Sequence, residues 1–370
     1  MLQHQHAALP VADHDEFARE EFCACLRKLF TTELWPANRA LYEQRMRPEF
    51  VARTGREPAT LAECKQLMEE SAAYRATNAI GRATQELLWD SVGESVERQL
   101  DTLVARARPR ADDLGTLRLN PDLAIPRYID SVDIHVMPGN FHTELGRDDV
   151  FAGALYDRGV HVFAFGGLGG LNDGMGQAAA AFFQERFPEL KPRRILDMGC
   201  GPGFTTLPWK EAFPQAEVHG IDIGAPQVRH AHSRAEALGR AIHYSQQDAS
   251  ATDFPDGHFD IVVSLLLTHE MPVPVIRKTY HEAHRLLAPG GVMLHDAASS
   301  APLAAFEQLM QTWFAYNVNE PFSMGWRGLD HRRAIVEAGF DPAQCFTGQR
   351  EAVYLKGQLP PVCFLGAVKS

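Results

Sequence analysis

The sequence has 370 residues, of which 45% are hydrophobic, so it is long enough for two domains or for one large domain with a substantial core. Its formal net charge of −11 argues against broad nucleic-acid binding, which needs a basic face. There is no apolar run long enough for a membrane span, no secretion-signal layout at the start and no CxxC pair among six scattered cysteines, so we expect a cytoplasmic protein with reduced thiols.

Residues 15–107 are predicted to form helices. Thr60 and Glu63 fit a capping box, in which two side chains accept hydrogen bonds from backbone N–H groups at the start of a helix. Further on, apolar residues recur at the spacing that places them on one helix face, namely Leu88, Val92, Val96, Leu100 and Leu103. We interpret this stripe as core packing or as the face of a homodimer formed through the N-terminal helices.

The composition changes after these helices. Residues 108–126 contain basic residues, then acidic ones, then Gly115, Pro121 and Pro126, which indicates a domain boundary. Residues 127–176 are predicted to be irregular, and a helix is expected over 177–192. Within the irregular stretch, FGGLGGLNDGMG at 165–176 is interpreted as a hinged lid. The predicted division is a helical domain over 1–120, an irregular substrate-covering segment over 121–190 and a third domain over 191–370.

Beyond residue 193, short apolar runs alternate with helical patterns. The predicted strands cover 194–198, 216–222, 241–248, 259–267 and 291–297. Strands that alternate with helices form a parallel sheet with helices on both faces, which is an α/β architecture. Two last runs, 343–357 and 360–370, are predicted to pair as a closing hairpin.

The turn after the first of these strands is rich in glycine and reads LDMGCGPGFTT, residues 196–206. Ligands of such sheets bind beyond the carboxyl ends of the strands, near the first strand–helix turn. Asp222 ends the second strand, where a carboxylate can accept both ribose hydroxyls. A dinucleotide fingerprint needs a glycine where Phe204 stands, and Asp197 would repel a pyrophosphate but suits an ammonium group. The turn therefore favours a nucleoside joined to an amino acid, which is S-adenosylmethionine.

Five segments in chain order resemble the class I S-adenosylmethionine-dependent methyltransferases, over residues 190–370. They are ILDMGCGPG, VHGIDI, QQDAS, FPDGHFDIVVSLLLTHE and HRLLAPGGVMLHD. The resemblance implies a Rossmann-like doubly wound sheet, the seven-stranded methyltransferase core, joined to the N-terminal helical domain. It also implies an enzyme that binds S-adenosylmethionine and releases S-adenosylhomocysteine.

The resemblance assigns residues to this cofactor. It implies that Asp222 holds the ribose, that Asp248 takes the adenine amino group and that the Ala249 backbone meets the adenine ring. The full set of expected cofactor residues is Asp197, Gly199, Gly201, Gly203, Asp222, Ile223, Asp248, Ala249, Ser264 and Leu265. A metal-dependent catechol type would need carboxylates after the fourth strand, where Ser264 and Leu265 stand instead, so we expect no metal.

Histidines and aromatic residues are the candidates for the acceptor side. A hydroxyl or an enolised carbon benefits from a base, and histidine suits that task at neutral pH. The catalytic candidates are His269 after the fourth strand, His295 at the end of the fifth, and His142 before the glycine-rich segments. The expected substrate-binding residues come from the irregular segment and are Tyr128, His135, Tyr156 and Phe165.

Together these features predict methyl transfer to a small organic acceptor, preferably aromatic, at oxygen, nitrogen or carbon. The fourth strand lacks the Asn/Asp-Pro-Pro-aromatic motif of enzymes that methylate nucleic-acid amines. Two alternatives remain open: a methyltransferase that acts on a protein or nucleic acid, and a non-catalytic cofactor-binding or scaffold protein. A NAD-dependent oxidoreductase is disfavoured by Phe204 and Asp197.

Overall fold

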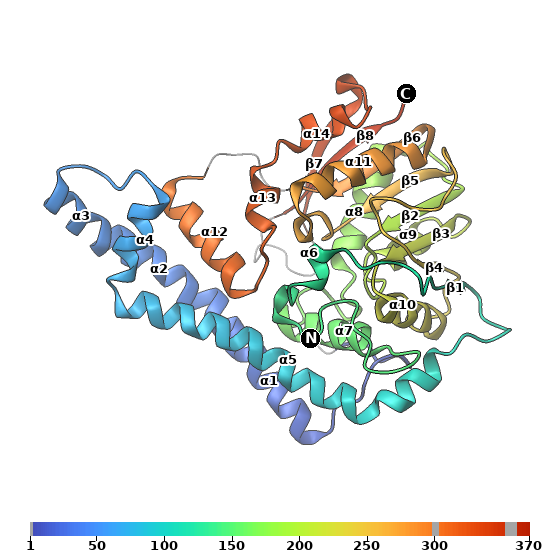
Figure 1. Cartoon of the computed structure of the whole chain (residues 1–370), viewed down its shortest axis with the longest axis horizontal. Coiled ribbons are helices and arrows are strands. Elements are labelled where there is room, and N and C mark those ends of the chain that lie inside the picture. Colours follow the sequence, from blue (N-terminus) through green and yellow to red (C-terminus); the bar gives the residue numbers. More distant parts are fainter. Residues whose placement is uncertain (1–2, 298–302, 352–360) are drawn as a thin grey trace.

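The computed structural model of the chain describes residues 3–297, 303–351 and 361–370. Figure 1 shows a sheet covered by helices and an arm of long helices that extends away from it. The arm confirms the predicted helical region and consists of α1 (His14–Leu29), η1 (Phe30–Leu34), α2 (Trp35–Leu41), η2 (Tyr42–Met46), α3 (Arg47–Thr54), α4 (Leu61–Glu69) and α5 (Ala72–Ala107). Thr60 caps α4 as expected, but the Glu63 carboxylate accepts from the Ala59 N–H instead of closing the capping box.

Eight strands form one sheet, in the order β1-β4-β3-β2-β5-β6-β8-β7. The strands are β1 (Thr116–Arg118), β2 (Arg194–Met198), β3 (Glu217–Asp222), β4 (His243–Gln246), β5 (Phe259–Ser264), β6 (Leu287–Asp296), β7 (Cys345–Arg350) and β8 (Val362–Val368). All neighbours run parallel except β8, which is antiparallel to β6 and β7. The predicted parallel strands and the closing pair are therefore confirmed, while 352–360 lies outside the described residues.

The sheet has one strand more than the predicted seven. The additional strand, β1, falls in the stretch interpreted as a domain boundary, and it pairs in parallel with β4, with Thr116 opposite His243. Gly115 permits this close approach, because a Cβ atom there would lie 1.9 Å from the carbonyl oxygen of Ile242. A strand of three residues carries too short a pattern to be recognised in a sequence.

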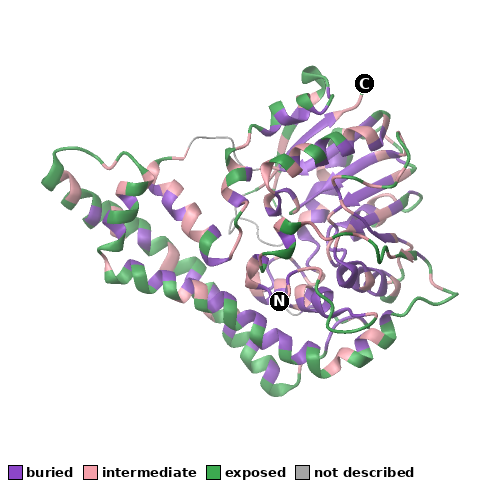
Figure 2. Cartoon of the chain, viewed as in Figure 1, coloured by how far each residue is buried: buried purple, intermediate pink, exposed green. Residues whose placement is uncertain are grey.

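Helices cover both faces of the sheet. One face carries α8 (Gly174–Arg186), α9 (Thr206–Ala212) and α10 (Ala225–Ala237), and the other carries α11 (Val273–Leu286) and α14 (His331–Glu337). Successive residues of β5 serve the two cores in turn, because side chains alternate along a strand: Ile261 and Val263 face one core and Val262 the other. Figure 2 shows the central strands largely buried, whereas the arm exposes many residues.

The arm is tied to the sheet domain at two places. The stripe on α5 packs against α7 (Phe151–Phe163), so its interpretation as core packing is confirmed. Near the far end of the arm, α12 (Ala305–Asn317) lies beside α4 and α5, with Phe306 and Leu309 in a shared core. Within the described residues, no helix combines the length and the apolar character needed to cross a membrane.

The segment predicted to be irregular contains a regular helix, α7, in addition to the short turns α6 (Arg127–Asp130) and η3 (Ile134–Val136). The prediction was wrong there because Gly153 and Gly159 lower helix propensity, whereas the fold needs them for close packing. A Cβ atom at 153 would lie 2.4 Å from the Cβ of His230. The next helix, α8, begins at Gly174 and ends at Arg186, earlier at both ends than predicted. The remaining elements are η4 (Thr268–Glu270), α13 (Ser323–Gly328) and η5 (Pro342–Gln344).

Gly159 offers a test of the packing between α5 and α7. A Cβ atom at this position would lie 2.2 Å from the ring of Trp89, so Gly159→Ala is expected to lower the free energy of unfolding by about 1–3 kcal/mol through overpacking. Gly93 in α5 has nothing within 4 Å of such an atom, so Gly93→Ala is the matched control and should raise that free energy by about 0.5–1 kcal/mol. Urea denaturation measures both, and equal effects of the same sign would contradict the packing.

Candidate active site

The turn between β2 and α9 is shaped by three glycines. Gly199, Gly201 and Gly203 have φ angles of 72°, 50° and 85°, in the left-handed region that favours glycine. The N–H groups of Gly199 and Cys200 donate to the carbonyl oxygen of Ile221, at 2.8 and 2.9 Å, which fastens the turn to β3. A Cβ atom at Gly201 would meet nothing within 4 Å, so this part of the turn faces open space.

Asp222 connects this turn to the end of β3. One carboxylate oxygen accepts from the Gly201 N–H at 3.0 Å, and the other accepts from the Gly224 N–H at 2.9 Å. Burial raises the pKa of this carboxyl above its ordinary value, against the effect of these hydrogen bonds. Each carboxylate oxygen keeps a further lone pair, so the group is positioned to accept two neighbouring hydroxyls.

A large cavity opens above this turn, with about 1030 Å³ of empty space including its mouth. One wall belongs to the sheet domain and contains the glycine turn, Asp222, Asp248 and the residues that follow β5. The opposite wall comes from segments that precede β2 in the chain and consists of Tyr128, Ile129, Phe141, Tyr156, Val160, Leu168, Asn172 and Met175. The carboxylates of the cavity, Asp222, Asp248 and Glu270, all lie in the first wall, which is called the polar wall below, whereas the second wall is mainly apolar and aromatic. Small-molecule sites commonly combine a few polar groups with an apolar lining in this way.

The structure brings many of the predicted site residues together. The expected cofactor residues in the cavity wall are Gly199, Gly201, Asp222, Ile223, Asp248, Ala249 and Leu265. Of the expected substrate residues, Tyr128 and Tyr156 line the same cavity. Leu168, Asn172 and Met175 all belong to the glycine-rich segment 165–176, so the predicted lid contributes to the cavity wall, while its closure stays a prediction.

Asp197 lies beneath the glycine turn and does not line the cavity. The residue is fully buried, and its Oδ2 accepts hydrogen bonds from the hydroxyls of Thr205 and Thr206, both at 2.7 Å. Burial raises the pKa of its carboxyl to about 7. Asp197 therefore holds the start of α9, and this geometry does not support the predicted contact with an ammonium group.

Other predicted residues also lie away from the cavity. Gly203 and Ser264 are absent from its wall, and Phe165 lines a separate hollow beside α1. His142 pairs with Asp130 at 3.2 Å outside that wall. His295 is fully buried against Tyr280, with ring centroids 5.1 Å apart, and burial lowers its pKa to about 3. The sequence places Ser264 and His295 at strand ends and His142 and Phe165 in the irregular segment, but the structure turns these side chains toward the interior or toward other surfaces.

His269 and His135 lie behind Glu270, which itself lines the cavity. Burial lowers the pKa of His269, but the Glu270 carboxylate outweighs burial through its charge and its hydrogen bond, and the pKa rises to about 9. The pKa of His135 is raised by the same carboxylate. With its proton in place at neutral pH, His269 donates a hydrogen bond there, and this does not support its predicted role as a base at that pH.

Sequence reasoning missed several residues of the site. Phe141 and Glu270 both line the cavity, and neither was among the candidates. Glu270 directly follows His269 at the carboxyl end of β5, so its position in the chain was a usable signal. Phe141 gave no such signal, because it reaches the cavity from an irregular segment whose path cannot be read from a pattern.

Comparison with known proteins indicates which family the domain that contains the glycine turn resembles. Residues 195–291 match the sequence profile of a family described as "Methyltransferase domain". Residues 195–291 therefore form a methyltransferase domain, which the sequence motifs relate to the class I S-adenosylmethionine-dependent enzymes. The chain is 36% identical over 126 residues to a demethylmenaquinone methyltransferase of Thermus thermophilus, which covers 34% of this chain and 56% of the relative. It is 31% identical over 123 residues to a malonyl-[acyl-carrier protein] O-methyltransferase of Pseudescherichia vulneris, which covers 33% and 46%.

The chain thus spans about half the length of these relatives. The matched domain contains the glycine turn, Asp222 and Asp248, which form the polar wall of the cavity. The aromatic wall, with Tyr128, Phe141 and Tyr156, lies outside the matched residues. The methyltransferase domain of this chain is therefore combined with an aromatic cavity wall that the family profile does not include.

Proposed function

We propose that this chain transfers a methyl group from S-adenosylmethionine to a small organic acceptor. The observation that carries the proposal is the position of Asp222, which joins two backbone N–H groups at the polar wall of a cavity whose other wall is aromatic. The polar wall can hold the nucleoside of the cofactor, and the aromatic wall can hold an apolar acceptor. The cavity can therefore bring the two substrates of a group transfer together.

The residues of the polar wall fit the cofactor. Asp222 has the free lone pairs to accept both ribose hydroxyls, and Asp248 and Ala249 lie in the same wall for the adenine. The Phe204 ring also lines the cavity, where a dinucleotide fold needs a glycine to approach a pyrophosphate. The cofactor would supply a methyl group that is already activated as a sulfonium.

The aromatic wall supports a small, apolar or aromatic acceptor. Tyr156 stacks on Phe204 with ring centroids 6.0 Å apart and meets Phe141 edge-on at 5.3 Å. Burial raises the pKa of Tyr156, so its hydroxyl stays protonated and can donate a hydrogen bond to an acceptor atom. These side chains would orient the acceptor and exclude water from the transfer. Neither His269 nor His135 is assigned as a base at neutral pH.

The test is to follow the methyl group itself. The purified chain is incubated with S-adenosylmethionine that carries a deuterated methyl group and with a small-molecule extract of its source cells, and boiled protein serves as the control. Mass spectrometry is expected to find the labelled methyl on a small molecule. Label only on a protein or nucleic acid, or no label although the cofactor binds, would contradict the proposal and favour one of the alternatives. A cytoplasmic location and a homodimer through the N-terminal helices stay predictions.

A further inference from the structure

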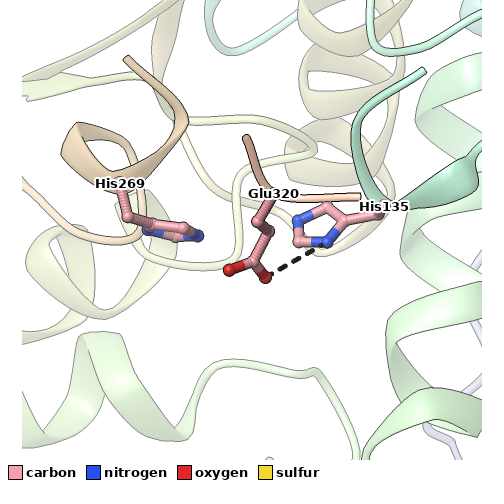
Figure 3. Close-up of side chains that lie close together, drawn as sticks. All are labelled: His135, His269 and Glu320. Atoms are coloured by element: carbon pink, nitrogen blue, oxygen red, sulfur yellow. Dashed lines mark ion pairs between the residues drawn. The ribbon is translucent and has the colours of Figure 1, made fainter. Parts of the chain in front are cut away.

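Two histidines and two carboxylates from three distant parts of the chain meet beside the cavity. His135 lies in η3, His269 and Glu270 lie in η4, and Glu320 follows α12. One ring nitrogen from each of the two histidines and one oxygen of Glu320 lie within 4.8 Å of one another. Figure 3 shows the carboxylate of Glu320 between the two imidazole rings.

Glu270 fixes both imidazole rings. Its Oε1 lies 2.8 Å from Nε2 of His135 and 3.1 Å from Nε2 of His269. On the opposite side of the His135 ring, Nδ1 faces Oε1 of Glu320 at 3.5 Å. A carboxylate on the outer nitrogen of an imidazole sets the tautomer and orientation of the ring, and metal-binding histidines almost always have such a partner.

The cluster contains a polar atom that the protein itself leaves unsatisfied. Glu270 is 7% exposed, and its Oε2 is buried without a hydrogen-bond partner among the described residues. Because the other oxygen of the same carboxylate contacts both rings, this atom lies within the cluster. A buried carboxylate oxygen without a partner is costly, and because Glu270 lines the cavity, this atom indicates that a ligand binds where the cluster meets the cavity.

The backbone of His135 is held in place from the arm. Its carbonyl oxygen accepts from Nε2 of Gln85 at 2.8 Å and from Nε1 of Trp89 at 2.7 Å, both in α5. His135 and Val136 have φ angles of 58° and 61°, which are strained for residues with a side chain. The fold therefore maintains an unfavourable backbone that brings this imidazole to the other two segments.

We propose that His135, His269 and Glu320 bind one divalent transition-metal ion. Two imidazoles with a carboxylate suit Zn²⁺ or Fe²⁺, whereas Mg²⁺ and Ca²⁺ prefer oxygen ligands throughout. Metal binding would displace a proton from each imidazolium to solvent, and the charges of Glu270 and Glu320 then match a divalent cation. The proposal departs from the sequence-based expectation of no metal, which considered only the residues immediately after the fourth strand of the motif region.

The position of the cluster suits an ion that takes part in binding the acceptor. Three protein ligands leave coordination positions free, as in catalytic metal sites. Glu270 lines the cavity, and so do Phe141 and Tyr156, whose rings lie 6.1 and 6.3 Å from that of His135. The free position would take a hydroxyl, enol or carboxylate oxygen of the acceptor, and this last step rests on the proposed function.

The experiment uses the full chain, stripped with EDTA and dialysed. Titration with Zn²⁺ in a calorimeter is expected to show one ion per chain, and Co²⁺ is expected to give the visible absorption of a nitrogen- and oxygen-coordinated site. Glu320→Gln and His135→Asn are each expected to weaken Zn²⁺ binding by at least about 10-fold, and Glu270→Gln by about 10- to 100-fold. His219→Asn is the matched control, because His219 also contacts a carboxylate, Glu217 at 2.8 Å, outside this cluster; it should leave Zn²⁺ binding unchanged.

Three results would overturn the proposal. They are no stoichiometric Zn²⁺ binding by the wild type, equal Zn²⁺ binding by Glu320→Gln, and a Co²⁺ spectrum that acetohydroxamate, an oxygen-donor probe of free coordination positions, leaves unchanged. If His135→Asn does not fold, Glu320→Gln decides alone. S-adenosylhomocysteine is titrated into the metal-free chain in parallel, so that loss of cofactor binding, which would refute the proposed function, is distinguished from loss of metal binding.

Discussion

The Asp222→Ala variant is expected to bind S-adenosylhomocysteine about 10- to 100-fold more weakly than the wild type. A hydrogen bond to a charged group contributes about 1.5–3 kcal/mol, and 1.4 kcal/mol corresponds to a tenfold change in affinity. The substitution also removes the carboxylate that accepts from the N–H groups of Gly201 and Gly224, so the glycine turn loses one of its connections to the end of β3, while the bonds of Gly199 and Cys200 to Ile221 remain. Isothermal titration calorimetry measures the affinity directly.

A matched control separates this effect from loss of charge. The Asp256 side chain is 81% exposed and pairs with Arg285 away from the cavity wall, so Asp256→Ala removes one negative charge from the same domain without touching the turn. Its affinity for S-adenosylhomocysteine should equal that of the wild type. Wild-type affinity in a folded Asp222→Ala variant would contradict the assignment of the ribose to this carboxylate.

The Asp157→Asn variant is expected to have a free energy of unfolding about 3–5 kcal/mol below that of the wild type at pH 7. Asp157 in α7 is fully buried, and its Oδ2 lies 3.0 Å from Nε2 of His230 and 3.3 Å from Nε of Arg234, both in α10. The substitution leaves the guanidinium of Arg234, which is also buried, without its counter-charge. Urea denaturation measures the difference.

The pH dependence of this difference follows from the pKa of Asp157. Burial raises that pKa, but the hydrogen bonds from His230 and His6 and the charge of Arg234 outweigh burial and hold it well below its ordinary value. A carboxyl with a lowered folded-state pKa contributes stability above its unfolded-state pKa of about 3.9, and this contribution is lost as the pH falls below that value. The difference between wild type and variant should therefore be complete at pH 7 and smaller at pH 3.

An exposed ion pair provides the comparison. The side chains of Asp253 and Arg118 are 57% and 55% exposed, so Asp253→Asn should change the free energy of unfolding by less than about 1 kcal/mol. An equally small change in the free energy of unfolding of Asp157→Asn at pH 7 would show that the contacts of Asp157 with His230 and Arg234 do not hold α7 against α10.

The positions of the strands along the chain and the place of the site could be predicted, because both depend on local signals. A glycine turn after one strand and an acid at the end of the next are read directly from the chain, and they placed Asp222 correctly in the cavity wall. The direction in which a side chain points at a strand end could not be predicted. Asp197 and His295 both lie at carboxyl ends of strands, yet the structure buries both completely. Nothing in the sequence distinguishes a side chain that is buried at a strand end from one that lines the cavity there.

Contacts between segments that are far apart in the chain could not be predicted from the sequence. The cluster of His135, His269 and Glu320 depends on three turns that meet only in the folded chain, and no spacing along the sequence relates them. The helix α7 was missed for a related reason, since its glycines are explained only by the neighbours they approach, Trp89 and His230.

The most direct test of the whole account is a crystal structure of the chain with S-adenosylhomocysteine. In that structure we expect the ribose hydroxyls within hydrogen-bond distance of both carboxylate oxygens of Asp222, the adenine beside Asp248 and Ala249, and the sulfur on the side of Tyr156. A ligand bound elsewhere, or a ribose turned away from Asp222 in this cavity, would contradict it.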